Sequence, residues 1–271
     1  MEQRVPAGDP RRPQRVPGEA LAAVRAVEEV VGRAPIAAYL SGSAVAGGLR
    51  PLSDVDVLVV LEGALDVAPR RRLAARLMRV SGRYGGGGPR RPLDVTVVRR
   101  ADVAPWRYPP VRAFAYGEWL RAAYEAGEGP PPGPHPDLAI ALAQARAIAL
   151  PLVGPPAHEL LEPVPPADLR RALRDALPAL IADLRGDERN VLLTLARMWR
   201  TAAAGEFAPK DAAATWAAAR LPTDLAAWIE LAGAAYVGTC DDDWSDRRSE
   251  AAALADRLRR EVEANLDGGG A

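Results

Sequence analysis

Residues 39–60, YLSGSAVAGGLRPLSDVDVLVV, place a Gly-Ser pair after a short apolar segment and an Asp-x-Asp pair at the start of a longer one. Over 53–61 the apolar residues alternate and then run continuously, as in a buried strand. Because side chains alternate faces along a strand, Asp54 and Asp56 should point the same way. Adjacent carboxylates repel unless a cation lies between them, and Mg²⁺ prefers such oxygen ligands. This segment therefore predicts a strand that presents a magnesium site.

The Gly42-Ser43 pair follows a predicted strand at 35–40. Glycine lets the backbone approach a phosphate closely. If a helix begins at Ala44, its free N–H groups and the Ser43 hydroxyl would hold phosphate oxygens.

A third predicted strand, PLDVTVV at 92–98, carries Asp94. If this strand lies beside 53–61, Asp94 can reach the same cations or an attacking hydroxyl. Three carboxylates on neighbouring strands are typical of in-line phosphoryl displacement with two metal ions. The alternative is that Asp54 only ends a turn after Pro51.

The composition narrows the classes of protein that remain. The chain has 271 residues, 49% of them hydrophobic, and a formal net charge of zero, which argues against a nucleic-acid surface. A single cysteine, Cys240, excludes an internal disulfide and indicates a reducing compartment. We find no signal peptide and no apolar run long enough for a membrane span, so a cytoplasmic protein is expected. Lys210 is the only lysine. Either this is chance, or the position needs a compact ammonium group rather than a planar guanidinium.

The predicted fold class is α+β, in three parts. Residues 1–17 form a disordered arm, 18–160 a domain with a small mixed sheet and flanking helices, and 161–271 a domain built as a helical bundle. The helices expected around the sheet are 18–32 and 67–80. After residue 136 only helices are expected: 136–150, 167–184, 188–204, 209–220, 223–236 and 244–266.

Several segments together resemble a known family. YLSGSAVAGGLRPLSDVDVLVV resembles the nucleotidyltransferase signature of the DNA polymerase beta-like superfamily. RPLDVTVV (91–98), PWRYP (105–109), GEWLR (117–121) and LVGP (152–155) narrow the resemblance to the aminoglycoside (3'')(9) adenylyltransferases, which act on streptomycin and spectinomycin. It continues through 186–222 and so covers nearly the whole chain after residue 18.

The resemblance implies that ATP and two Mg²⁺ ions bind between the two domains. Carried over to this chain, it makes Asp54 and Asp56 metal ligands and Ser43, beside Gly42, a contact of the triphosphate. Lys210 matches the family's phosphate-contacting lysine. Two further residues match positions on the nucleotide side: Arg197 and Tyr236.

At position 94 the chain departs from the family, which usually has a glutamate there as catalytic base. Asp94 is one methylene shorter, which puts the rate and the choice of substrate in doubt. The residue would still serve as a base or as a third carboxylate at the metals.

On the drug side, the resemblance implies that Asp183 and Asp187 face a polycationic drug and that Trp119 packs on streptomycin. Asn190 is a further candidate for a polar contact. Structural alternatives stay open: Asp187 could simply be the N-cap of a helix, and Trp119 a core aromatic.

The predicted function is transfer of AMP from ATP to the 3''-OH of streptomycin, the 9-OH of spectinomycin, or both. The chain is expected to act as a monomer on small molecules, without nucleic-acid or membrane partners. One alternative is an antitoxin-like nucleotidyltransferase module that modifies a protein partner. Another is a relative that only binds ATP or drug.

Overall fold

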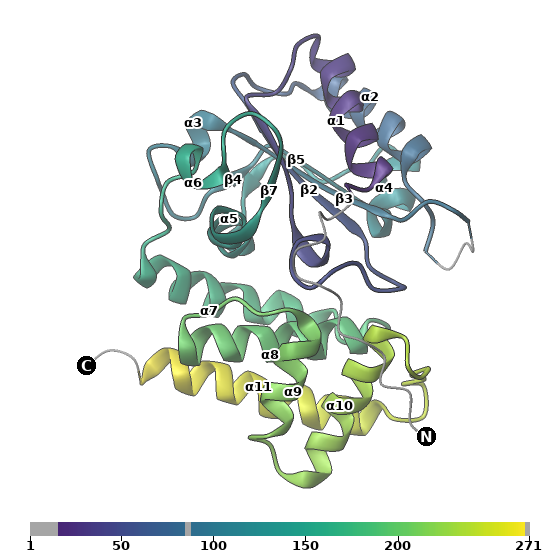
Figure 1. Cartoon of the computed structure of the whole chain (residues 1–271), viewed down its shortest axis with the longest axis vertical. Helices are drawn as coiled ribbons and strands as arrows, with labels where there is room; N and C mark the ends of the chain where they lie inside the picture. The colour runs from purple at the N-terminus through teal and green to yellow at the C-terminus, as the bar shows by residue number, and fades with distance from the viewer. Residues whose placement is uncertain (1–15, 85–87, 269–271) are drawn as a thin grey trace, which may run out of the picture.

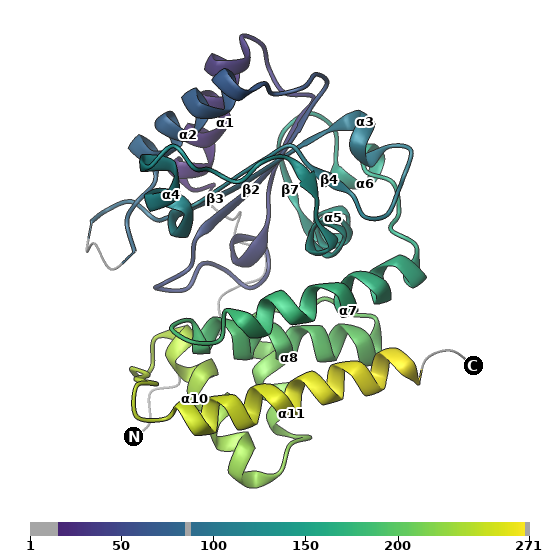
Figure 2. The ribbon, with the colours of Figure 1, turned by 180° about the vertical axis from the view of Figure 1, so that it is seen from behind.

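The computed structural model describes residues 16–84 and 88–268, so nearly all of the predicted arm at 1–17 lies outside the described residues. A sheet half (16–165) lies above a helical half (166–268) in Figure 1, and Figure 2 shows the same two layers from behind. The predicted α+β fold class is confirmed.

The central sheet is mixed and has the strand order β5-β3-β2-β1-β7. β2 and β3 are parallel, and the other neighbouring strands are antiparallel. Its strands are β1 (Ala37–Leu40), β2 (Val55–Leu61), β3 (Leu93–Arg99), β5 (Phe114–Gly117) and β7 (Leu150–Val153). A separate ribbon pairs β4 (Val111–Arg112) with β6 (Gly133–Pro134).

The prediction that only helices follow residue 136 is wrong at β7. This strand returns to the sheet and pairs with β1. It contains Pro151, which cannot donate to a ladder and is therefore confined to an edge, where β7 lies. β5 was missed too, because four residues are too few to show a period of two.

Helices cover both faces of the sheet. On one face, α1 (Gly18–Val31) and α2 (Val67–Val80) pack on β-strand residues such as Leu40, Val57 and Val95. The opposite face, which carries Tyr39, Leu58 and Val98, is covered by three helices: α3 (Arg100–Val103), α5 (Pro136–Ile148) and α6 (Ala157–Leu160). α4 (Arg121–Glu125) follows β5 through the 3-10 turn η2 (Glu118–Leu120).

The helical half has its own apolar core. Its helices are α7 (Pro166–Ala182), α8 (Glu188–Ala204), α9 (Lys210–Ala218), α10 (Thr223–Val237) and α11 (Arg248–Asp267). All five were predicted, although α11 begins four residues later than expected. The difference arises at Trp244, which is buried in the connection before α11. No helix among the described residues is both long and apolar enough to cross a bilayer.

Candidate active site

Three neighbouring strands carry a row of paired positions near their ends that face the helical half. In the parallel pair, Asp56 of β2 is the register partner of Asp94 of β3, and Asp94 is in turn the partner of Gly117 on β5. Register partners point to the same side of a sheet. Asp54 lies two residues before Asp56 and shares that side. The expectation that the third strand lies beside the second is confirmed, and its Asp94 is next to Asp56.

All three carboxyl groups have raised pKa values, and part of the shift at Asp56 and Asp94 comes from neighbouring carboxylates. Burial, and then the charge of Asp54, raise the pKa of Asp56 to about 6. Burial and the charges of Asp56 and Asp54 raise the pKa of Asp94 well above its usual value. The pKa of Asp54 is also raised, by burial above all. A nearby cation would relieve this crowding.

The donor set fits a divalent cation. It consists of carboxylate oxygens, which Mg²⁺ prefers, and Asp54 Oδ1 is buried without a hydrogen-bond partner. Yet among residues 16–84 and 88–268 no three His, Cys, Asp or Glu side chains are gathered closely enough to hold a metal by themselves. Asp54 turns its other oxygen to the Tyr84 hydroxyl, which donates to it at 2.8 Å. The three-carboxylate metal site therefore stays a prediction.

The Gly42-Ser43 pair lies directly against this row, in the 3-10 turn η1 (Gly42–Ala44). Gly42 has a φ of +61°, and a Cβ at this position would lie 1.9 Å from Asp56 Oδ2, so no other residue fits here. The helix expected from Ala44 does not form beyond this single turn. Gly47 and Gly48 follow it with positive φ values and direct the chain into the β1–β2 connection instead.

The helical half contributes cations opposite the carboxylates. Arg197 donates to Ala208 O at 3.0 Å and to Gln144 Oε1 at 2.9 Å. The Lys210 ammonium lies 5.5 Å from the centre of the Tyr236 ring. Burial lowers the pKa of both Arg197 and Lys210, while the Asp56 carboxylate acts to raise both. The structure thus brings the three residues predicted for the nucleotide side together, beside Asp56.

Asn190 links a residue predicted to contact the drug, Asp187, to one predicted to contact the nucleotide, Lys210. Its amide donates to Asp187 Oδ1 at 2.7 Å, and its carbonyl oxygen accepts from Lys210 at 3.1 Å. Asp187 is at the N-cap position of α8, but its side chain does not cap the helix. The alternative of a purely capping role is therefore wrong. Asp183, at the end of α7, is exposed, and its charge acts to raise the pKa of Asp187.

Trp119 lies beside the row formed by Asp56, Asp94 and Gly117 rather than in a core. Its side chain is 56% exposed. A Cβ on Gly117 would lie 2.3 Å from the Trp119 ring, so the ring covers the side of the sheet to which Asp94 points. The alternative of a core aromatic is wrong.

The sequence prediction missed two groups at this site. Tyr84, in the α2–β3 connection, is half exposed and contacts Asp54; a lone tyrosine in a glycine-rich loop carries no signal. Glu118 is buried and accepts hydrogen bonds from Ser81 Oγ at 3.0 Å, Tyr116 OH at 2.9 Å and Arg121 Nη2 at 3.0 Å. It anchors η2, which carries Trp119.

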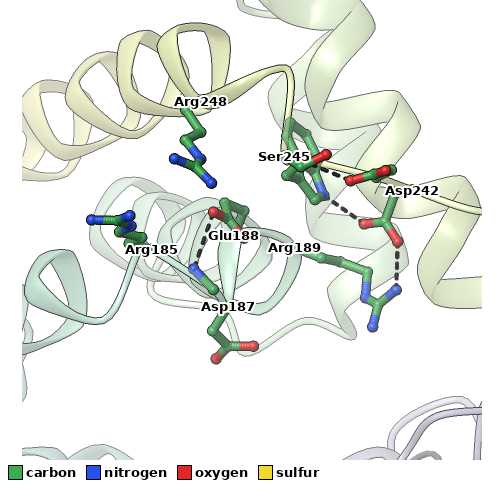
Figure 3. Close-up of a pocket in the computed structure, with 10 residues that line it drawn as sticks. Arg185, Asp187, Glu188, Arg189, Asp242, Ser245 and Arg248 are labelled. Atoms are coloured by element: carbon green, nitrogen blue, oxygen red, sulfur yellow. Dashed lines mark hydrogen bonds and ion pairs between the residues drawn. The ribbon is translucent and has the colours of Figure 1, made fainter.

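A hollow of about 560 Å³ lies where α8 and α11 begin. Figure 3 shows Arg185 and Arg248 around it, with Asp187 at its edge. Arg189 pairs with Asp242 at 2.6 Å, and Asp242 also accepts from Trp244 Nε1 at 2.7 Å. These contacts tie the α10–α11 connection to the first turn of α8.

Comparisons with known proteins agree with this geometry. Residues 159–261 match the family described as "Aminoglycoside adenylyltransferase, C-terminal domain", and residues 23–82 match "Nucleotidyltransferase domain". A spectinomycin 9-adenylyltransferase from Staphylococcus aureus is 46% identical over 93% of this chain and 97% of the relative. An aminoglycoside (3'')(9) adenylyltransferase from Escherichia coli is 41% identical over 84% of this chain and 87% of the relative.

A solved structure is similar as well. The crystal structure of spectinomycin adenyltransferase AAD(9) from Enterococcus faecialis, with ATP and spectinomycin, superposes with a TM-score of 0.86 at 31% identity. The match covers 91% of this chain and 99% of that one.

Proposed function

Because the chain belongs to the family of the spectinomycin 9-adenylyltransferases and aminoglycoside (3'')(9) adenylyltransferases, we propose that it transfers AMP from ATP to a hydroxyl of such a drug. The acceptor is the 9-OH of spectinomycin, the 3''-OH of streptomycin, or both, and pyrophosphate leaves. ATP is the co-substrate, as in the related structure solved with ATP. The protein-modifying alternative has no support, since relatives that match almost end to end are drug adenylyltransferases.

One observation carries the proposal. A row of carboxylates with raised pKa values lies opposite Lys210 and Arg197, which come from the other half of the chain. A magnesium–triphosphate complex supplies cations to the carboxylates and anions to the basic side chains. The cations of that complex would therefore meet carboxylates, and its phosphates would meet basic side chains.

We assign the metal to Asp54, Asp56 and Asp94, with two Mg²⁺ ions. When bound there, Mg²⁺ would neutralise charge on the phosphate oxygens and the departing pyrophosphate. Asp94, on β3, accepts the proton of the attacking hydroxyl.

The remaining residues bind and orient the nucleotide. Gly42 keeps the turn open toward Asp56, and Ser43 in the same turn donates to phosphate oxygens. Lys210 and Arg197 neutralise charge that develops on the leaving group, and Tyr236 packs against the Lys210 ammonium.

The drug would enter beside Asp94. Asp183 and Asp187 supply carboxylates for its cationic groups, Asn190 a polar contact and Trp119 a flat surface. The family resemblance links Trp119 and Asp183 to streptomycin, so their presence favours streptomycin as a substrate alongside spectinomycin.

We also propose two domains, 18–160 and 161–271, acting as a monomer without nucleic acid. Support comes from the site itself, because both halves of a single chain contribute to it.

The test is incubation of the purified protein with ATP, Mg²⁺ and each drug, followed by mass spectrometry. At least one drug should gain one AMP while pyrophosphate is released. Asp54→Asn should lower turnover by more than about a hundredfold, whereas Asp256→Asn, at an exposed ion pair on α11, should not. If neither drug gains AMP, the proposal is wrong.

A further inference from the structure

An ion pair connects the two halves of the molecule next to the site. Arg50, in the β1–β2 connection, pairs through Nη2 with Oδ2 of Asp211, in the first turn of α9. Within the described residues it is the only ion pair between the sheet half and the helical half. In Figures 1 and 2 this connection extends from the sheet toward the helical half.

On the sheet side, Arg50 is held in a fixed position relative to Asp54. Arg91 Nη1 donates to Arg50 O at 2.7 Å and to Ser53 O at 3.0 Å. Arg50 N donates to Ser53 Oγ at 3.0 Å. Because Ser53 directly precedes Asp54, these hydrogen bonds fix Arg50 relative to the Asp54 carboxyl group.

On the helical side, Asp211 is held in a fixed position relative to Lys210. The two residues are consecutive at the start of α9, and Asp211 Oδ1 accepts from Ala212 N at 3.0 Å, within the first turn. No side chain caps this helix, since its N-cap is Pro209. Pro209 also approaches the β1–β2 connection: a Cβ on Gly47 would lie 3.7 Å from its ring.

We propose that Arg50 and Asp211 are positioning residues for ATP, which set the Lys210 ammonium at the right distance from Asp54 and Asp56. The inference rests on the proposed function, in which Lys210 contacts the triphosphate. Without the pair, the first turn of α9 loses its charged tie to the sheet half, and Lys210 spends less time opposite the carboxylates. Both side chains are about a third exposed, at 30% and 29%, so the pair adds little to folding stability and acts mainly on the geometry.

Calorimetry with Mg²⁺ and α,β-methylene-ATP tests this in the full-length protein. Arg50→Gln and Asp211→Asn should each weaken binding about five- to twentyfold, and the double variant no more than the stronger single one. In the kinetic assay, KM for ATP should rise while KM for the drug stays within about twofold. Arg50→Lys should recover most of the affinity.

The matched control is Glu261→Gln, which breaks an ion pair of similar exposure with Arg257 on α11; it should leave nucleotide binding unchanged. Unchanged affinity in both single variants, or additive losses in the double variant, would overturn the proposal. So would a loss in the Glu261 variant of the same size. If the wild-type protein modifies neither drug, the proposed function fails, but the calorimetry still decides whether the pair positions Lys210 for a nucleotide.

Discussion

Neutralising Asp56 should stabilise the metal-free protein while abolishing its activity. Burial and the charge of Asp54 raise the pKa of Asp56 to about 6 in the folded state, against about 3.9 in an unfolded chain. The folded protein therefore binds this proton more tightly. The stability that protonation of Asp56 contributes to the folded state is fully present below pH 3.9 and is lost as the pH rises through 6. Because asparagine stays uncharged at every pH, the Asp56→Asn variant does not lose this stability as the pH rises.

The size of the effect follows from the difference of about two pKa units. Each unit corresponds to about 1.4 kcal/mol, so the variant should gain about 3 kcal/mol in free energy of unfolding at pH 8. For a chain of this size that is a rise in Tm of roughly 6–10 °C. The gain should be about half as large at pH 5, where the unfolded carboxyl is still ionised, and under about 1 kcal/mol near pH 4.

Thermal unfolding in EDTA at pH 4, 5 and 8 measures this, with Asp256→Asn as the control for loss of an exposed carboxylate. Equal Tm values for wild type and the Asp56 variant at pH 8 would refute the reasoning. A gain that is independent of pH would do the same, because it would come from packing and not from the crowded charges.

Three further outcomes are expected. Asp94→Asn should lower kcat about 10²- to 10⁴-fold in steady-state kinetics; a normal kcat would exclude a proton-accepting role. Gly117→Ala should displace the Trp119 ring, since a Cβ there would lie 2.3 Å from it, and cut streptomycin turnover at least tenfold; in a Trp119→Ala background the same change should have no further effect, and a persistent loss would point to the strand instead. Burial acts to raise the pKa of Glu118, but hydrogen bonds from Arg121, Tyr116 and Ser81 outweigh it, so the net pKa is lowered. Glu118→Gln should therefore lower the free energy of unfolding by about 1–3 kcal/mol at neutral pH. This loss of stability should shrink as the pH falls through the lowered pKa, and melting curves that differ equally at pH 3 and pH 7 would contradict this.

The local part of the site was predictable from the sequence. Asp54 and Asp56 share a side because alternation along a strand follows from backbone geometry alone, and the apolar run around them identified the strand. The Gly42-Ser43 pair was placed by the same local logic. Lys210 was singled out as the only lysine, but its role came from the family resemblance. Arg197 and Tyr236 entered the prediction through that resemblance alone.

Other features were decided only by the tertiary structure. The register that sets Asp94 beside Asp56 depends on how β2 and β3 pair across more than thirty residues of intervening chain. The short strands β5 and β7 are stabilised by their neighbours rather than by their own propensity. The Tyr84–Asp54 hydrogen bond and the Arg50–Asp211 ion pair join segments whose sequences carry no pattern that would predict their contact. Backbone geometry acts over a few residues and can be deduced from the order of the side chains, whereas these contacts exist only because apolar packing brings together segments that are distant in the sequence.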